Sequence, residues 1–165
     1  MTYDGRVSTT SLTPRRIYRI VAIAEMVTWA LLILGMVGKY ILKLGDWPVR
    51  VFGLTHGIVF VTYAFVALLV GVNQHWRLRH VIAAVATAVI PFATYPFDVW
   101  LVRRGMLTGG WRTARSEDPR DHTRLSGVLR FALRYPIPLA VVVIIGVFAV
   151  VSFLLWLGPP TEWGA

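Results

Sequence analysis

The sequence predicts an all-α integral membrane protein with four transmembrane helices in an antiparallel bundle, and its composition and charge pattern carry this prediction. The chain has 165 residues, of which 56% are hydrophobic and only 15% are charged, whereas soluble proteins carry about 25% charged residues. The charged residues are concentrated between long apolar stretches rather than within them. A water-soluble core of this size cannot bury so much apolar surface, so lipid must cover part of it.

Net charge and cysteine content exclude several classes of protein and site. The formal net charge is +9, which in a soluble protein would indicate nucleic-acid binding. Here the basic residues flank the apolar stretches, a pattern typical of topology control and of contact with anionic lipid headgroups. We therefore expect no nucleic-acid partner. The chain has no cysteine, which excludes disulfides, thiolate metal sites and cysteine nucleophiles.

The first two spans are expected at residues 17–37 and 51–72, after a polar N-terminal tail of residues 1–16. Each span has the twenty or so apolar residues that a helix needs to cross a bilayer. No small-residue cleavage site follows the basic N-terminal residues, so the first span is expected to be retained rather than removed as a signal peptide. The short link between the two spans favours an antiparallel hairpin.

The third span is expected at residues 81–102, and it completes a three-helix membrane core over residues 17–104. Pro91 and Pro96 lie inside this span, and each removes a backbone N–H and strains the preceding turn. The segment around them is therefore expected to be kinked or locally unwound.

An arginine-rich stretch, residues 105–135, separates this core from the fourth span. In its second half apolar residues recur at helical spacing with arginines between them, which predicts an amphipathic helix in the membrane interface. The alternative is a continuation of the fourth helix. The fourth span itself is expected at residues 137–157, within a C-terminal segment of residues 136–165 that ends in a short tail.

The orientation in the membrane depends on the positions of lysine and arginine, and two criteria disagree. Counting the basic residues of the loops places the stretch 103–134 in the cytoplasm. Arg15 and Arg16, which precede the first span, favour the opposite orientation. In either orientation, contacts with anionic lipid headgroups are expected from Arg103, Arg104, Arg124, Arg130 and Arg134.

Three ionisable residues, Glu25, His56 and Asp98, lie inside the predicted spans. A charge at the centre of a bilayer costs about 2.5–3.5 kcal/mol on insertion scales, so each residue needs a partner or a neutral form. In a four-span bundle, His56 and Asp98 would both lie about 6–8 Å below the same membrane surface, and we expect their side chains to be in contact. Lys39 and Tyr40 would form a motif at the membrane end above them.

Helical spacing extends this contact into a polar seam, defined here as Glu25, His56, Tyr63, Thr94 and Asp98. His56 and Tyr63 share a helix face, as do Thr94 and Asp98. These faces are expected to point at each other, because facing lipid would leave their polar groups unsatisfied. Tyr63 or a water molecule is the expected partner of Glu25.

The polar seam has two interpretations. In the structural one, buried polar pairs lock the helices together, and each pair contributes about 0.6 kcal/mol. In the functional one, the same residues form a proton relay or a ligand site, because ionisable residues inside a membrane are functional candidates. Neither a metal site nor a cofactor is expected, since His56 is the one histidine inside a predicted span.

Four ordered motifs within residues 16–104 carry a resemblance to a known family. They are Glu25 in IAEM, MVGKY at 36–40, THG at 55–57 and IPFATYPFD at 90–98. With these motifs, the chain resembles a family of small bacterial integral membrane proteins that is named for a His-Gly motif and catalogued as a domain of unknown function. The resemblance implies a membrane location and a three-helix core, and it implies no known activity. The chain departs from the family pattern at Val37-Gly38, where Pro-Leu is usual, and at Met26 and Ala93, where glycine is usual.

These features favour a small non-catalytic membrane protein that serves as an accessory or assembly subunit of a larger membrane complex, or that assembles with copies of itself. The expected location is the cytoplasmic membrane of a bacterium, with anionic lipids and other membrane subunits as partners. The alternative is a small oligomeric transporter, linked to protons or a solute, that uses Glu25, His56, Tyr63 and Asp98. A lipid-modifying enzyme is a third interpretation, weakened because no Ser-His-Asp arrangement or metal-ligand spacing is evident.

Overall fold

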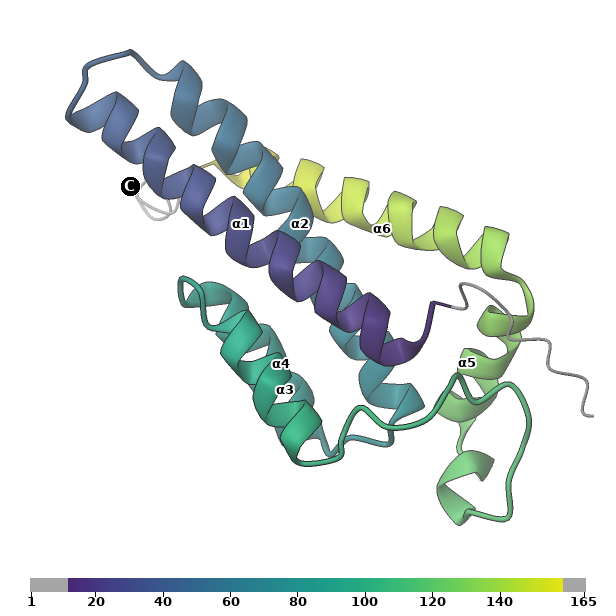
Figure 1. Cartoon of the computed structure of the whole chain (residues 1–165). Helices are drawn as coiled ribbons and strands as arrows, with labels where there is room; N and C mark the ends of the chain where they lie inside the picture. Colours follow the sequence, from purple (N-terminus) through teal and green to yellow (C-terminus); the bar gives the residue numbers. More distant parts are fainter. Residues whose placement is uncertain (1–11, 159–165) are drawn as a thin grey trace, which may run out of the picture.

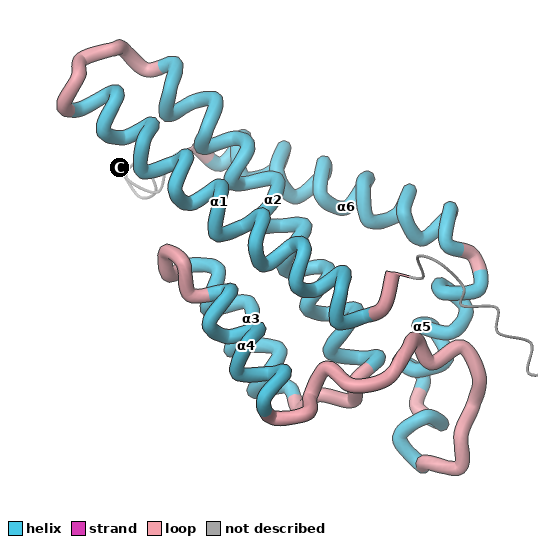
Figure 2. The backbone as a smooth tube through the Cα atoms, viewed as in Figure 1, coloured by secondary structure: helices cyan, strands magenta, loops and turns pink. Residues whose placement is uncertain are grey.

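The computed structural model describes residues 12–158, and every regular element within that range is a helix (Figure 2). The elements are α1 (Pro14–Tyr40), α2 (Trp47–Asn73), α3 (Leu78–Val89), α4 (Thr94–Arg103), a short 3₁₀ helix η1 (Pro119–His122), α5 (Arg124–Arg134) and α6 (Pro136–Leu157). Residues 1–11 of the predicted N-terminal tail and residues 159–165 of the predicted C-terminal tail lie outside the described residues.

Helices α1, α2 and α6 are each long and apolar enough to cross a membrane, which confirms three of the four predicted spans in length and hydropathy. Helices α1 and α2 form a hairpin and run side by side in opposite directions (Figure 1). At Gly35 an added Cβ would lie 3.0 Å from the Pro48 carbonyl oxygen and 3.0 Å from the Phe52 ring. Glycine at this position therefore allows the close approach of the two helices.

The prediction of a single third span over residues 81–102 is wrong. In its place stand α3, of 12 residues, and α4, of 10 residues, separated by a turn at residues 90–93. At 1.5 Å per residue these helices are about 18 and 15 Å long, shorter than the roughly 30 Å hydrocarbon core. Pro91 cannot continue α3, and Phe92 takes a left-handed conformation with φ of 64°, which reverses the chain. The described residues thus hold three candidate spans rather than a four-span bundle.

Helices α3 and α4 form a hairpin, called here the α3–α4 hairpin, in which α3 packs against α2 and α4 returns along α1 (Figure 1). Four hydrogen bonds, taken in order along this part of the chain, reach progressively earlier positions of α1 and the residues before it. They join Trp29 Nε1 to Ala88 O (2.9 Å), Thr94 Oγ1 to Ala22 O (2.9 Å), Arg19 Nε to Asp98 Oδ2 (2.8 Å) and Trp111 Nε1 to Leu12 O (2.7 Å). Helix α4 therefore ends beside the start of α1, and both ends of the hairpin lie at that end of the molecule.

Helix α5 is separate from α6, because the helical conformation is interrupted at Tyr135 and the last helix begins at Pro136. The alternative of a continuous fourth helix is thereby excluded, while the location of α5 in the membrane interface stays a prediction. Helix α6 packs along α2, and its Gly146 lies against the Phe65 ring, where an added Cβ would be 3.0 Å from Cζ.

The buried core lies where α1, α2, α3 and α4 meet, and small residues dominate its α3 side. It includes Tyr18, Ala22, Tyr63, Ala67, Ala84, Ala88 and Leu101. Alanine lets the backbones approach closely, as is typical of helix packing in membranes. Polar side chains on the same helices are thereby brought within hydrogen-bonding distance of one another.

Candidate polar site between the helices

The residues of the polar seam lie on three helices, with Glu25 on α1, His56 and Tyr63 on α2, and Thr94 and Asp98 on α4. All except His56 have 0% exposure. Such complete burial obliges each polar group to find a partner inside the chain, because an unpaired buried polar group costs about 1–3 kcal/mol. Most of the hydrogen-bond partners of these residues differ from the partners predicted from the sequence.

Glu25 is bound by Thr94 and not by Tyr63, one of its two predicted partners, while the other, a water molecule, stays a prediction. The Thr94 hydroxyl lies 3.0 Å from Glu25 Oε2 and 2.9 Å from the Ala22 carbonyl oxygen. Its one proton serves both acceptors, so the contact links α4 to α1 at two points. The other carboxylate oxygen, Glu25 Oε1, is buried and has no hydrogen-bond partner within the protein.

Asp98 is paired with Arg19, and the predicted His56–Asp98 contact is wrong. Arg19 Nε lies 2.8 Å from Asp98 Oδ2. The α3–α4 hairpin returns Asp98 to the start of α1, whereas a continuous third span would have carried it to the other end of the molecule beside His56. Asp98 Oδ1, like Glu25 Oε1, is buried without a hydrogen-bond partner.

His56 is bound instead to Thr28 on α1, with 3.1 Å between His56 Nδ1 and Thr28 Oγ1. The Thr28 hydroxyl donates its proton to the Glu25 carbonyl oxygen at 2.9 Å, so the ring nitrogen must be the donor in the bond to Thr28. This arrangement places a proton on Nδ1. The ring also packs against Trp29, with 4.6 Å between the ring centroids.

Tyr63 forms a second polar contact between helices, with Tyr18 and Thr87. The two tyrosine hydroxyl oxygens are 2.6 Å apart, and Tyr63 Oη lies 3.4 Å from Thr87 Oγ1. The Thr87 hydroxyl donates to the Ala84 carbonyl oxygen at 2.6 Å, so Tyr63 is the donor to Thr87 and Tyr18 the donor to Tyr63. This chain of hydroxyls links α1, α2 and α3.

Four residues of the site lie outside the polar seam as predicted, and they are Tyr18, Arg19, Thr28 and Thr87. Tyr18 is seven residues before Glu25 on the same helix face, and this spacing could have identified it. Arg19 gave no such signal, because it stands among the basic residues that flank the first span and is indistinguishable there from a topology determinant.

The predicted membrane-end motif, Lys39 and Tyr40, lies at the turn between α1 and α2, far along α1 from Asp98. Lys39 Nζ lies 2.9 Å from Asp46 Oδ1 and 5.2 Å from the centroid of the Tyr40 ring. The hydrogen bond from Lys39 holds the pKa of Asp46 below its ordinary value. The motif therefore fastens the turn of the first hairpin.

Four of the five arginines predicted to contact lipid headgroups are exposed, and they are Arg103, Arg104, Arg124 and Arg134. The Arg104 guanidinium lies 5.5 Å from the centroid of the Trp100 ring, within the range of a cation–π contact. Arg130 is partly buried and donates from Nη1 to the Asp121 carbonyl oxygen at 2.9 Å. Their contact with anionic lipid stays a prediction.

Residues 15–103 match the family described as Domain of unknown function (DUF3817). The chain belongs to this family. The matched range runs from α1 to α4, close to the predicted 16–104, and so contains the whole polar site, while α5 and α6 follow the DUF3817 domain. The naming of the family after a His-Gly pair is not confirmed by this match.

A relative from Streptomyces coelicolor, named as a candidate membrane protein, is 42% identical to this chain over 93 residues. The alignment covers 56% of this chain and 11% of the relative, so the chain spans a small fraction of that protein's length. No solved structure matches the chain. The relative's name and the three long apolar helices identify this DUF3817 protein as a membrane protein.

The chemistry available to the DUF3817 domain follows from these contacts. Within residues 12–158 no group of three or more histidine, cysteine or acidic side chains could hold a metal ion. Four polar pairs or chains of side chains join α1 to α2, α3 and α4, and the carboxylates of Glu25 and Asp98 each keep one free oxygen. The arrangement can fasten four helices together, and each free carboxylate oxygen can accept one further hydrogen bond.

Proposed function

We propose that this protein is a non-catalytic membrane subunit that accompanies a larger membrane complex. The observation that carries the proposal is the pairing of the buried polar groups with one another, which gives them a structural role. Three of these pairs connect α1 to another helix, and they are Arg19 with Asp98, Glu25 with Thr94, and Thr28 with His56. The matched stretch is a small part of a longer relative, which supports a module that works beside other protein segments.

Helix α6 is the surface that best suits a partner. It lies outside the family domain, and only 6% of the residues in its apolar stretch are buried by the rest of residues 12–158. Val147 is the one residue of the helix that the rest of residues 12–158 buries. A neighbouring membrane helix could therefore pack along the side of α6 that faces away from α2, using apolar contacts alone.

We further propose that the chain spans the cytoplasmic membrane of a bacterium three times, with the α3–α4 hairpin entering and leaving on one side. Lys39, Lys43 and Arg50 lie at the α1–α2 turn, whereas every other lysine and arginine of residues 12–158 belongs to the opposite end. This arginine-rich end would then be cytoplasmic. The hairpin removes the disagreement between the two orientation criteria, since the start of α1 and the stretch 103–134 fall on the same side.

The membrane-subunit proposal is tested by purifying the tagged protein in native lipid discs, without detergent, from the bacterium that produces it. We expect a larger membrane protein to be recovered in fixed stoichiometry. Ile145→Ala with Phe148→Ala, at positions that are 61% and 74% exposed, should release that partner and leave the melting temperature unchanged. Val147→Ala, at the buried position, serves as the matched control and should lower the melting temperature while the partner stays bound. Recovery of the protein alone as a monomer contradicts the proposal.

A second function, proton- or solute-linked transport, is favoured by the two free carboxylate oxygens of Glu25 and Asp98. A buried carboxylate with an open acceptor position can bind and release a proton. Reconstituted vesicles under a pH gradient test this function, with Glu25→Gln as the variant that removes the titratable group and keeps the hydrogen bond from Thr94. Proton flux that Glu25→Gln abolishes, in a variant that still folds, would favour transport over the subunit role.

A further inference from the structure

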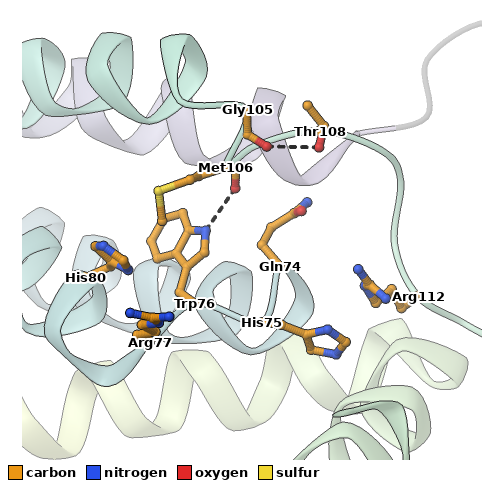
Figure 3. A pocket seen from close by; sticks show the side chains of 9 residues that line it. All are labelled: Gln74, His75, Trp76, Arg77, His80, Gly105, Met106, Thr108 and Arg112. Atoms are coloured by element: carbon orange, nitrogen blue, oxygen red, sulfur yellow. Dashed lines mark hydrogen bonds between the residues drawn. The ribbon is translucent and has the colours of Figure 1, made fainter. Parts of the chain in front are cut away.

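A polar cavity of about 380 Å³ lies outside the polar seam, where α2 ends, α3 begins and the loop after α4 passes over them (Figure 3). Its volume is within the roughly 300–1,000 Å³ of small-molecule sites. The polar side chains that line it are Gln74, His75, Arg77, His80, Thr108 and Arg112. This part of the molecule belongs to the arginine-rich end.

Positive charge predominates around the cavity. Arg77 has no ion-pair partner among residues 12–158, and it stands at the N-terminus of α3, where the helix dipole adds partial positive charge. Asp121 pairs with His75, and its Oδ2 lies 3.5 Å from Arg112 Nη1. Asp118, a second carboxylate that interacts with His75, is paired with Arg120. The Arg77 charge is balanced by neither of them, and an anion is the ligand that this surplus favours.

Three side chains of the cavity wall carry buried polar atoms without a hydrogen-bond partner, namely Gln74 Nε2, His75 Nδ1 and His80 Nδ1. The His75 side chain is only 8% exposed, and its Nε2 lies 3.0 Å from Asp121 Oδ1. His75 has a left-handed backbone with φ of 53°, and the next N–H, that of Trp76, bonds to the Gly71 carbonyl oxygen at 2.8 Å, so His75 is the residue that ends α2 and starts the turn into the cavity wall. Small rotations about the side-chain bonds would turn these donors toward a ligand in the cavity.

The walls of the cavity are fixed by hydrogen bonds between α2 and the loop opposite. Trp76 Nε1 donates to the Met106 carbonyl oxygen at 2.8 Å, a bond drawn in Figure 3. The fully buried Asn73 donates to the Gly110 carbonyl oxygen at 3.2 Å and accepts from the Arg112 backbone N–H at 2.9 Å. The cavity is therefore preformed, which reduces the entropy lost on binding.

We propose that this cavity binds a phosphate group, carried either by an anionic lipid headgroup or by a soluble phosphate ester. A guanidinium fork, imidazole N–H groups, an amide donor and a helix N-terminus are the groups that recognise phosphate oxygens. A site at the arginine-rich end suits the headgroup region of the membrane, where basic pockets bind acidic lipids. The proposal does not depend on the subunit function.

Arg77 and Arg79 provide a matched pair of variants. Arg77 lines the cavity, whereas Arg79, two residues further along and also exposed, does not. The retention of phosphatidylglycerol is measured by native mass spectrometry on the full chain, in discs that contain equal amounts of phosphatidylglycerol and phosphatidylcholine. We expect Arg77→Gln to lower the ratio of retained phosphatidylglycerol to phosphatidylcholine about tenfold. Arg79→Gln should change this ratio less than twofold, and equal melting temperatures would show that both variants fold.

A second arm of the experiment distinguishes the two sources of the phosphate group. Glycerol 3-phosphate is titrated calorimetrically into the protein in neutral detergent free of lipid. Saturable binding that Arg77→Gln weakens about tenfold identifies a soluble ester as a sufficient ligand. Retention of phosphatidylglycerol without such binding identifies the lipid. The proposal is overturned if neither ligand binds, or if Arg77→Gln and Arg79→Gln reduce binding equally, because the effect would then be one of net charge.

Discussion

At the scale of single residues, the ion pair between Arg19 and Asp98 is the contact on which the position of α4 depends most. Asp98 is completely buried and Arg19 is 37% exposed, so the guanidinium reaches solvent while the carboxylate does not. A buried carboxylate that loses its counterion is strongly destabilising, and replacing its charge is less so. The two partners are therefore not equivalent.

We predict that Arg19→Gln lowers the free energy of unfolding by about 3 kcal/mol, because it leaves the Asp98 charge buried and unpaired. Asp98→Asn should cost less, since it removes that charge and keeps the shape. Unfolding in detergent of both single variants and the double variant measures the coupling, expected at about 1–3 kcal/mol. Additive effects of the two substitutions would contradict the pairing.

Residue patterns predicted which side chains are buried but not which partners they have. Glu25, Tyr63, Thr94 and Asp98 are all buried, as helical spacing suggests, because spacing reports the face of a helix. Partners depend on the relative height of two helices, and that height was inferred from a continuous third span. When the span reverses, Asp98 moves from the level of His56 to the level of Arg19.

At the scale of elements, α1, α2 and α6 are predictable because each is an uninterrupted apolar run of sufficient length. The α3–α4 hairpin is not predictable in this way, since hydropathy is averaged over residues and does not distinguish a chain that continues across the membrane from one that turns back. Pro91 indicates that the helix is interrupted, but a proline is compatible both with a kinked span and with a reversal of the chain. The contacts that select the reversal, such as the bond from Trp29 Nε1 to the Ala88 carbonyl oxygen, join residues distant in sequence.

The α1–α2 hairpin yields a prediction from its glycines. Gly35→Ala should destabilise the protein, because the added Cβ would lie 3.0 Å from the Pro48 carbonyl oxygen, part of a helix backbone that cannot yield locally. Gly57→Ala is the matched control, since no atom lies within 4 Å of its added Cβ. Thermal unfolding should show a lower melting temperature for Gly35→Ala and an unchanged one for Gly57→Ala. Equal melting temperatures of the two variants would mean that the hairpin packs less closely than described.

The loop before α5 contains the groups whose ionisation can be followed outside the spans. A hydrogen bond from Ser116 holds the pKa of Asp121 below its ordinary value, and Arg120 does the same for Asp118. A carboxyl group whose pKa is lower in the folded state stabilises that state above the unfolded pKa of about 3.9, and this contribution is lost as the pH falls through the folded value.

We therefore predict that residues 112–126 keep constant protection from amide exchange between about pH 7 and pH 5, after correction for intrinsic rates, and lose it progressively below about pH 4. Asp121→Asn should show weaker protection at neutral pH and a smaller dependence on pH. Loss of protection on raising the pH from 5 to 7 would contradict this sign.

At the scale of the whole molecule, the number of membrane crossings decides which segments share a side. The chain lacks cysteine, so single cysteines can be introduced without background. We predict that Leu78→Cys and Thr113→Cys react with a membrane-impermeant maleimide from the cytoplasmic side, and Ile41→Cys from the opposite side. In a four-span protein Leu78 and Thr113 would be labelled from opposite sides, and that result would exclude the hairpin topology.

The hairpin accompanies α1 only as far as Trp29, so in the proposed three-span topology the protein would be broader in one leaflet than in the other. It would then displace unequal numbers of lipid molecules from the two monolayers. In the proposed orientation, a wedge of this shape would be accommodated with least strain where the cytoplasmic monolayer is already stretched, as on a membrane that bulges toward the cell interior. Geometry alone would thus give the molecule a preference for curved membrane, before any partner is considered.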